Sequence, residues 1–154
     1  YVSLGGNLMI IGERPDGDPF KFGLRDPQGD ASTYLGTVTL EDGCTMATTG
    51  GYERYFEQDG QTYWHIMDPF TGHPADSGLI SVTIVGDEGV VCDGLSTALF
   101  VMGLEKAADL WAQSGDFEAV FVTASGEVYI TEGLRDRFAL TEQYADTPVS
   151  VIGR

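Results

Sequence analysis

The sequence has few basic residues. Eight Lys and Arg stand against 24 Asp and Glu in 154 residues, which gives a formal net charge of −16 at pH 7. An acidic excess of this size repels the phosphates of nucleic acids and the headgroups of anionic membranes. The composition therefore argues against nucleic-acid binding, although an acidic, solvated surface does not by itself identify a cellular compartment.

Cysteine is also scarce. Cys44 and Cys92 are the only two, and neither belongs to a CxxC or a Cys/His pattern, so a disulfide framework and a zinc site are excluded. Both lie in apolar surroundings, so we expect two buried thiols. One bridge between them is the alternative.

Long apolar runs and an initiator methionine are missing too. No stretch is long and apolar enough to span a bilayer, and the N-terminus has no basic segment followed by an apolar one. The chain opens at Tyr1-Val2-Ser3-Leu4, which reads as the middle of a strand. We therefore expect a fragment or a processed product, which leaves a signal peptide upstream as an open possibility.

The residues that are present are typical of a folded globular domain. The chain is 42% hydrophobic and 11% aromatic, and it is long enough to bury one core. Short β-type runs separated by Gly, Pro and Asp turns predict strands over residues 8–13, 20–24, 34–40, 46–49, 52–57, 62–66 and 79–85. Asp59-Gly60 predicts a tight hairpin turn between the fifth and sixth of these.

In the last third of the chain the spacing of apolar residues changes from that of strands to that of helices. Residues 93–102 and 105–114 carry helical spacing, with Gly103 and Gly115 as stops. Residues 119–123 and 127–131 then predict a second hairpin. The sum predicts an α+β fold, a mostly antiparallel sheet with helices packed on one face. No linker divides the chain.

Asp93 and Thr97 are the first candidates for chemistry. If Asp93 opens the helix, the carboxylate and the hydroxyl four residues later share a face and can turn toward one hard cation. Oxygen ligands suit Mg²⁺ or Ca²⁺, and Mg²⁺ is usually held by few protein groups together with waters and phosphates. The alternative is that Asp93 is an ordinary N-cap and Thr97 a buried hydroxyl bonded back to its own helix.

His65 is the second candidate. It closes a predicted strand and precedes Asp68-Pro69, a dipeptide that makes the chain turn. An imidazole can serve as a general base or orient a phosphate. A packed, hydrogen-bonded histidine is the alternative. His73, in a Gly-His-Pro turn, reads as an exposed loop residue.

Two glycine pairs complete the set. Gly5-Gly6 lies between apolar strand residues, where a backbone can approach a ligand without an intervening Cβ, although a β-bulge uses the same residues. Gly50-Gly51 precedes Tyr52, which can stack on a ring, and Arg54, which can pair with a phosphate. The alternative is an amphipathic strand with its charged residues in solvent.

Four segments follow one another in a recognisable order. They are Ser3 to Asn7 (Ser-Leu-Gly-Gly-Asn), Thr49 to Tyr55 (Thr-Gly-Gly-Tyr-Glu-Arg-Tyr), His65 to Gly72 (His-Ile-Met-Asp-Pro-Phe-Thr-Gly) and Cys92 to Ala98 (Cys-Asp-Gly-Leu-Ser-Thr-Ala). In this order and at these spacings they resemble the FAD:protein FMN transferase family, also called the ApbE family. The resemblance covers essentially the whole chain, but only the C-terminal half of the family's domain.

The resemblance implies a Mg²⁺-dependent enzyme that takes FAD as substrate and joins FMN to a Thr or Ser hydroxyl of an acceptor protein, releasing AMP. By the same resemblance Asp93 and Thr97 are metal ligands and His65 is the base or phosphate orienter. Gly5, Gly6, Tyr52, His65 and Ile66 are assigned to FAD binding. It also implies an acceptor such as a respiratory electron-transfer subunit, and an extracytoplasmic, membrane-anchored lipoprotein.

The chain departs from the family pattern in two ways. Gly51 stands where the family usually has Asp, and the family's N-terminal half is absent, so this chain would be part of a larger single domain. We therefore expect the chain alone to bind FAD weakly and to transfer nothing. A FAD pyrophosphatase that gives FMN and AMP, and a non-catalytic flavin-binding module, are the alternative functions.

Overall fold

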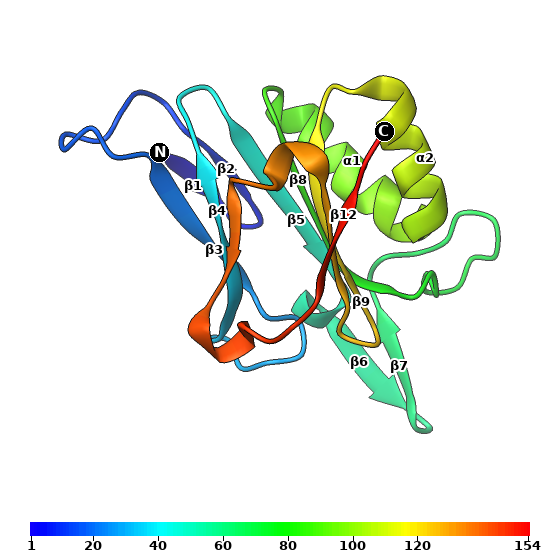
Figure 1. Ribbon diagram of the computed structural model, residues 1–154. Coiled ribbons are helices and arrows are strands. Elements are labelled where there is room, and N and C mark those ends of the chain that lie inside the picture. Colours follow the sequence, from blue (N-terminus) through cyan, green and yellow to red (C-terminus); the bar gives the residue numbers. More distant parts are fainter.

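The computed structural model describes residues 1–60 and 62–154 with their side chains, and Gln61 by its backbone alone (Figure 1). Its largest element is a seven-stranded sheet. In order across the sheet, the strands are β1 (Val2–Leu4), β2 (Asn7–Met9), β5 (Thr45–Gly50), β8 (Leu79–Gly86), β9 (Glu118–Thr123), β10 (Val128–Thr131) and β12 (Val149–Ile152). Neighbours pair antiparallel, except that β10 and β12 are parallel.

Two smaller sheets and two helices complete the fold. The three-stranded sheet has the order β11 (Phe138–Leu140), β4 (Tyr34–Leu40), β3 (Phe20–Arg25), and the two-stranded sheet consists of β6 (Tyr55–Gln58) and β7 (Gln61–Trp64). The helices are α1 (Gly89–Met102) and α2 (Leu104–Ser114), and the 3-10 turns are η1 (Gly51–Glu53), η2 (Glu132–Leu134) and η3 (Glu142–Tyr144). The structure confirms the predicted α+β class with a mostly antiparallel sheet.

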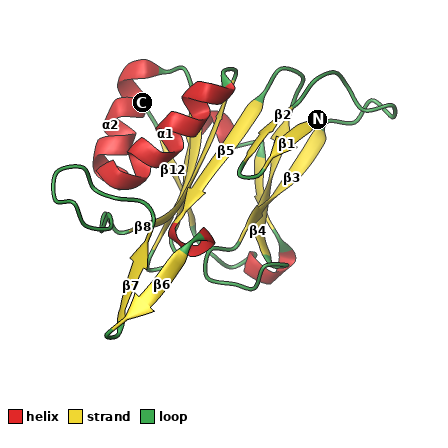
Figure 2. Cartoon of the chain, turned by 180° about the vertical axis from the view of Figure 1, so that it is seen from behind, coloured by secondary structure: helices red, strands yellow, loops and turns green.

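The central strands β8 and β9 of the large sheet are buried on both faces. Along β9, Ala119 and Phe121 pack with the helices, whereas Val120 and Val122 belong to a second core on the side of the three-stranded sheet. Because successive strand residues point to opposite faces, a strand covered on both sides reads as a continuous apolar run. Figures 1 and 2 show α1 and α2 on one side of this sheet and β3 and β4 on the other.

Both helices end at glycine, as predicted. Gly103 has φ +81° and Gly115 has φ +71°, and the backbone N–H of each bonds to the carbonyl four residues earlier. A positive φ costs little only for a residue without a Cβ, which is why glycine stops these helices. None of the helices in the described part of the chain is long and apolar enough to cross a membrane.

The hairpin of β6 and β7 projects from the body of the molecule (Figures 1 and 2). Its turn is Asp59-Gly60, with φ +54° and +77°, which confirms the tight turn expected from that dipeptide. Phe56 and Tyr63 stack across the hairpin with ring centroids 5.1 Å apart. Tyr55 and Trp64, opposite each other in the ladder, line a pocket.

Four predicted boundaries were wrong by two residues or more. The strand predicted over residues 62–66 ends at Trp64, so His65 follows the strand and does not close it. The strand predicted over residues 8–13 ends at Met9, because β2 pairs with β5 only over three residues. The strand predicted over residues 52–57 begins at Tyr55, since Tyr52 and Glu53 form the 3-10 turn η1. The helix predicted to begin at Asp93 begins at Gly89, one turn earlier.

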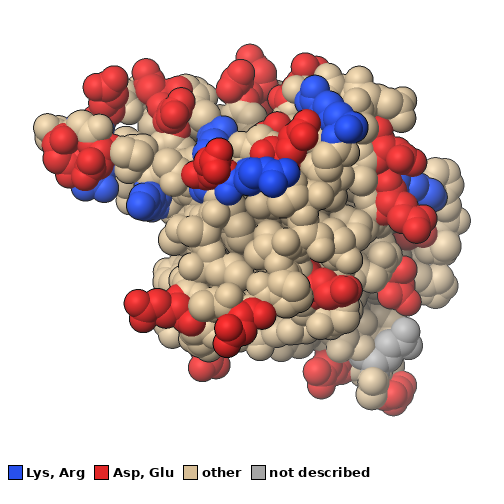
Figure 3. Space-filling model, in the orientation of Figure 1, with Lys and Arg blue, Asp and Glu red and all other residues tan. Residues whose placement is uncertain are grey.

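The two cysteines are both free thiols, so the alternative of a bridge between them was wrong. Cys92 is buried, as expected, and Cys44 is half-buried. Burial raises the pKa of the Cys92 thiol to about 11. Acidic side chains are spread over the face drawn in Figure 3, in keeping with the large negative net charge.

Candidate functional site

Asp93 and Thr97 lie in the second and third turns of α1. Glu88, not Asp93, is the N-cap, so the reading of Asp93 as an N-cap was wrong. Both side chains are exposed, and they are four positions apart, so they share one face of the helix. Thr97 is not a buried hydroxyl bonded back to its helix, because it is exposed and its hydrogen-bond partner is Thr49 of β5.

Three side-chain hydrogen bonds connect α1 to the sheet. The carboxamide Nδ2 of Asn7 donates to Oδ1 of Asp93 over 2.9 Å. The hydroxyl of Thr49 lies 3.0 Å from Thr97 Oγ1 and 2.8 Å from Ser96 Oγ. Oxygens from β5 and α1 and an amide from β2 therefore meet in one polar cluster, formed by Asn7, Thr49, Asp93, Ser96 and Thr97.

The donor set of this cluster fits a hard cation. Its candidate ligands, the Asp93 carboxylate and the Thr97 hydroxyl, are both oxygens. No group of three or more His, Cys, Asp or Glu side chains that could share a metal ion occurs in the part of the chain that the structure describes. A site with only two protein ligands is typical of Mg²⁺, because Mg²⁺ completes its octahedron with waters and substrate phosphates.

Gly5 and Gly6 form the two-residue turn between β1 and β2, next to the polar cluster. Gly5 has φ +75°, as a type II′ hairpin turn requires at its first loop residue. A Cβ on Gly6 would lie 3.1 Å from the carbonyl oxygen of Thr48, and the Gly6 carbonyl accepts a hydrogen bond from the Thr48 N–H. The glycines thus let β1 and β2 approach β5 closely, and their role toward FAD stays a prediction.

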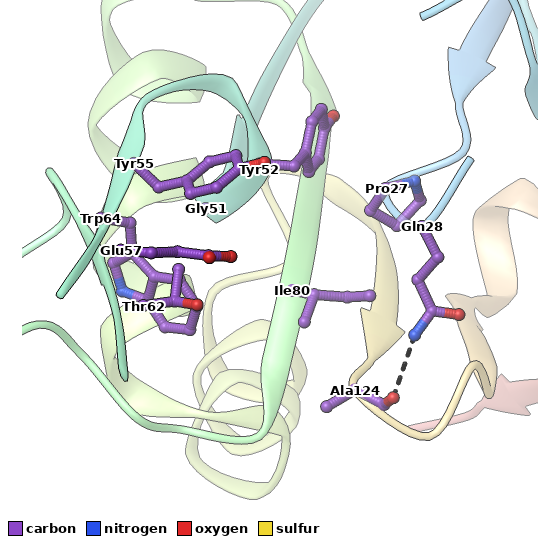
Figure 4. A pocket seen from close by; sticks show the side chains of 10 residues that line it. All are labelled: Pro27, Gln28, Gly51, Tyr52, Tyr55, Glu57, Thr62, Trp64, Ile80 and Ala124. Atoms are coloured by element: carbon purple, nitrogen blue, oxygen red, sulfur yellow. Dashed lines mark hydrogen bonds between the residues drawn. The ribbon is translucent and has the colours of Figure 1, made fainter. Parts of the chain in front are cut away.

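A pocket of about 370 Å³ includes Gly51 and Tyr52 of η1, the turn that follows β5, in its lining. Tyr55, Trp64 and their neighbours stand on one wall, and Pro27, Gln28 and Ala124 on the other (Figure 4). The Gln28 carboxamide donates to the Ala124 carbonyl over 3.1 Å and ties the second wall together. The pocket is lined by Pro27, Gln28, Gly51, Tyr52, Tyr55, Glu57, Thr62, Trp64, Ile80 and Ala124. Apolar and aromatic side chains combined with a few polar groups are typical of small-molecule sites.

Tyr52 is the one predicted cofactor-binding residue that lines this pocket. It is half-buried, and that burial raises the pKa of its phenol. The Arg25 guanidinium lies 4.9 Å from the centre of the Tyr52 ring and also pairs with Glu53 over 3.2 Å. Arg25 therefore fixes the ring from one side.

Gly51 is buried beneath the indole of Trp64. A Cβ at this position would lie 2.8 Å from Cε3 of Trp64. The indole cannot easily move away, because its Nε1 donates to the Ala75 carbonyl over 3.1 Å. An Asp at position 51, usual in the family that the sequence resembles, could therefore not be accommodated with Trp64 in this position.

His65 follows β7 directly and is exposed. Its Nδ1 lies 3.2 Å from the carbonyl oxygen of Arg54. Because a carbonyl only accepts, Nδ1 carries the proton in this contact, which leaves Nε2 of the neutral ring as a proton acceptor. The Ile66 side chain is buried in the core beside the helices and does not line the pocket. His73 is exposed, as expected.

Sequence reasoning missed Asn7 and Thr49 as members of the polar cluster, and Trp64 as a wall of the pocket. Asn7 and Thr49 both lie inside the segments that carry the family resemblance, so that resemblance was the available signal. Trp64 precedes His65 and follows another aromatic residue, a pattern that does not distinguish packing from a binding surface.

Together, the fold and the site define an α+β domain in which the short segment from Thr49 to Tyr52 connects an oxygen-only candidate cation site to a pocket with aromatic lining. Residues 1–121 match the ApbE family, and the chain belongs to this family. It is 38% identical over 138 residues to a FAD:protein FMN transferase of Klebsiella pneumoniae, which covers 90% of this chain and 42% of that protein. It is 37% identical to a FAD:protein FMN transferase of Treponema pallidum, over 88% of this chain and 40% of that protein.

Solved structures agree with the family assignment. The ApbE protein of Thermotoga maritima superposes with a TM-score of 0.76 at 38% identity, over 86% of this chain and 42% of that one. The apo flavinyl transferase ApbE of Pseudomonas stutzeri gives 0.62 at 34% identity, over 90% of this chain and 39% of that one. The chain thus spans about two fifths of the length of these relatives.

Proposed function

We propose that this chain takes part in the transfer of FMN from FAD to a Thr or Ser hydroxyl of an acceptor protein, with Mg²⁺ as the metal and AMP as the second product. The exposed Asp93 and Thr97 pair on α1 carries the proposal, because it offers two oxygen ligands, and Thr49, which contacts Thr97, is two residues before Gly51 of the pocket lining. The curated relatives bear the name FAD:protein FMN transferase, which supports the same chemistry.

Asp93 and Thr97 would hold the metal. When bound, Mg²⁺ supplies charge neutralisation on the pyrophosphate oxygens as the phosphorus–oxygen bond breaks. Asn7 holds one carboxylate oxygen of Asp93, and Oδ2 makes no hydrogen bond with the described part of the chain, which leaves it for a cation.

His65 would act as the base. The acceptor hydroxyl forms a new bond to the phosphorus on the FMN side of FAD, the bond from that phosphorus to the bridging oxygen breaks, and AMP leaves with that oxygen. The hydroxyl proton passes to Nε2 of His65, the nitrogen left unprotonated when Nδ1 donates to the Arg54 carbonyl. Tyr52 and the pocket walls would bind a ring of the substrate, and the backbones of Gly5, Gly6 and Ile66 would contribute to FAD binding.

We further propose that this chain supplies the C-terminal part of the flavin transferase domain. In this proposal the remainder of the domain completes the FAD site, so the chain alone binds FAD weakly and has no transferase activity. Turnover by the chain alone would contradict this proposal. An acceptor in an electron-transfer complex and an extracytoplasmic, membrane-anchored location are proposed from the family resemblance alone.

The test is intact-mass spectrometry of an acceptor domain that contains a target Thr. The acceptor is incubated with FAD, Mg²⁺ and a family-length protein, meaning a protein that carries this chain together with the N-terminal half of the domain. We expect a mass gain of one FMN and release of AMP, both absent from the Asp93→Ala variant. Asp109→Ala, a carboxylate exposed on α2, is the matched control and should leave the gain unchanged.

The same experiment distinguishes the other functions. Release of FMN and AMP without a mass gain would support a FAD pyrophosphatase, in which water replaces the protein hydroxyl. Retained FAD binding without either product would support a non-catalytic flavin-binding module. Each of these two outcomes would contradict the proposed transfer of FMN to an acceptor protein.

A further inference from the structure

Three hydroxyls form a chain between β5 and α1. Thr97 Oγ1 lies 3.0 Å from Thr49 Oγ1, Thr49 Oγ1 lies 2.8 Å from Ser96 Oγ, and Ser96 Oγ lies 2.9 Å from the carbonyl oxygen of Asp93. Ser96 is buried, Thr49 is half-buried and Thr97 is exposed. This series of hydroxyls therefore runs from the protein interior to the surface on which the candidate cation ligands lie.

The donor in each of these hydrogen bonds follows from the number of protons that each group can donate. A hydroxyl has one proton to donate, and a carbonyl oxygen has none. The Ser96 proton therefore goes to the Asp93 carbonyl, which obliges Thr49 to donate to Ser96. Because the Thr49 proton is committed, Thr97 must be the donor in its bond with Thr49.

This order determines what Thr97 can offer. Its proton points inward to Thr49, so the lone pairs that remain on Oγ1 are available on the exposed side, where a cation could approach. A Thr97 hydroxyl free to rotate could instead present its proton to the cation. The Thr49 acceptor excludes that orientation whenever the bond is made.

We propose that Thr49 is a positioning residue for the metal site, and that it acts by accepting the Thr97 proton through the chain anchored on the Asp93 carbonyl. This inference rests on the proposed function, because it takes Asp93 and Thr97 as the ligands. Thr49 does not itself touch the cation. Outer-shell partners that orient metal ligands typically change metal affinity by roughly 10- to 100-fold when they are removed.

The experiment measures Mn²⁺ binding to the family-length protein by electron paramagnetic resonance, with Mn²⁺ as the probe in place of Mg²⁺. The Thr49→Val variant keeps the shape of the side chain and removes the acceptor, so its dissociation constant for Mn²⁺ should rise by roughly tenfold or more. Thr49→Ser, which restores a hydroxyl, should bind nearly as the parent protein does.

Thr48→Val is the matched control. Thr48 is the neighbouring residue of β5, it is also half-buried, and its hydroxyl bonds to Thr83 Oγ1 over 2.9 Å instead of to α1. Its substitution should lower the thermal midpoint about as much as Thr49→Val and leave Mn²⁺ affinity unchanged. Equal losses of affinity in the two valine variants would show a general structural effect and overturn the proposal.

Asp93→Ala separates this inference from the proposed function. If Asp93→Ala loses Mn²⁺ binding and Thr49→Val does not, the metal site stands and the positioning role of Thr49 is wrong. If Asp93→Ala binds Mn²⁺ as well as the parent protein, or if the parent protein binds none, the metal site itself is wrong and the role of Thr49 is overturned with it.

Discussion

The side chain of Asn7 holds that of Asp93 across 86 positions of sequence, with a distance of 2.9 Å between Nδ2 and Oδ1. Asn7 belongs to β2 and Asp93 to α1, so the bond also fixes the helix against the sheet. A candidate metal ligand on an exposed helix face is thereby restricted to one orientation.

Removing this contact should weaken metal binding more than folding. In Asn7→Ala the carboxylate of Asp93 gains rotational freedom, so we expect the dissociation constant for Mn²⁺ to rise by roughly tenfold. The stability cost should be about 1 kcal/mol or less, since the bond is exposed. Titration with Mn²⁺ and thermal unfolding measure the two effects. In the control Gln113→Ala, which removes an exposed carboxamide bond on α2, the Mn²⁺ affinity should not change.

Gly51→Ala should destabilise the protein, because the new Cβ would lie 2.8 Å from an indole that is tied to the Ala75 carbonyl. We expect a loss of about 1–3 kcal/mol, typical of overpacking, as measured by chemical denaturation. Gly94→Ala is the control, for which we expect a change in the free energy of unfolding of the opposite sign. Nothing lies within 4 Å of the Cβ position at Gly94. In the middle of a helix this change should stabilise by roughly 0.5–1 kcal/mol. A neutral Gly51→Ala would mean that Trp64 is free to move.

His65→Gln should slow transfer strongly while leaving the metal site intact. The glutamine cannot accept and release a proton as an imidazole does, so kcat should fall by roughly 10²- to 10⁴-fold. Mn²⁺ affinity should stay unchanged, because His65 is not one of the proposed metal ligands. His73→Gln, a change at the other exposed histidine, should leave both quantities unaltered. A small effect of His65→Gln on kcat would assign His65 to a structural role.

Cys92 should make stability depend on pH in alkaline solution. Burial raises the pKa of its thiol from 9.0 to about 11, so the folded state keeps a proton that the unfolded chain releases. The free energy of unfolding should therefore decrease as the pH rises from about 9 to about 11. Denaturation midpoints across this range, compared between the parent protein and Cys92→Ala, isolate the contribution. The variant should show a flatter profile, and equal slopes would contradict the assignment.

Local sequence patterns correctly predicted turns and helix ends that depend on glycine. Asp59-Gly60 supplies the two positive φ angles of its turn, and Gly103 and Gly115 end their helices for the same steric reason. The start of α1 was missed because Gly89-Val90-Val91 has poor helix propensity. Val90 and Val91 are exposed, so no apolar periodicity marks this first turn either. β12 was not predicted at all, since its parallel pairing with β10 depends on a distant strand.

In the candidate site, too, some residues could be predicted from local spacing and others could not. The spacing of Asp93 and Thr97 was enough to place two oxygens on one helix face, wherever the helix began. Asn7 and Thr49 could not be assigned from spacing, because their partners are far away in sequence and are brought together by sheet and helix packing. Gly51 could be read as a departure from a family pattern, but its physical reason is the position of Trp64.

The turn after β5 connects the polar cluster to the pocket. Thr49 belongs to the polar cluster and Tyr52 lines the pocket, and three peptide units connect them. Their Cα atoms can therefore be at most about 11 Å apart, whatever the rest of the fold does. Under the proposed function one ligand with an aromatic ring and an anionic group would contact both sites, and this short connection limits how far the backbone of either site can move relative to the other.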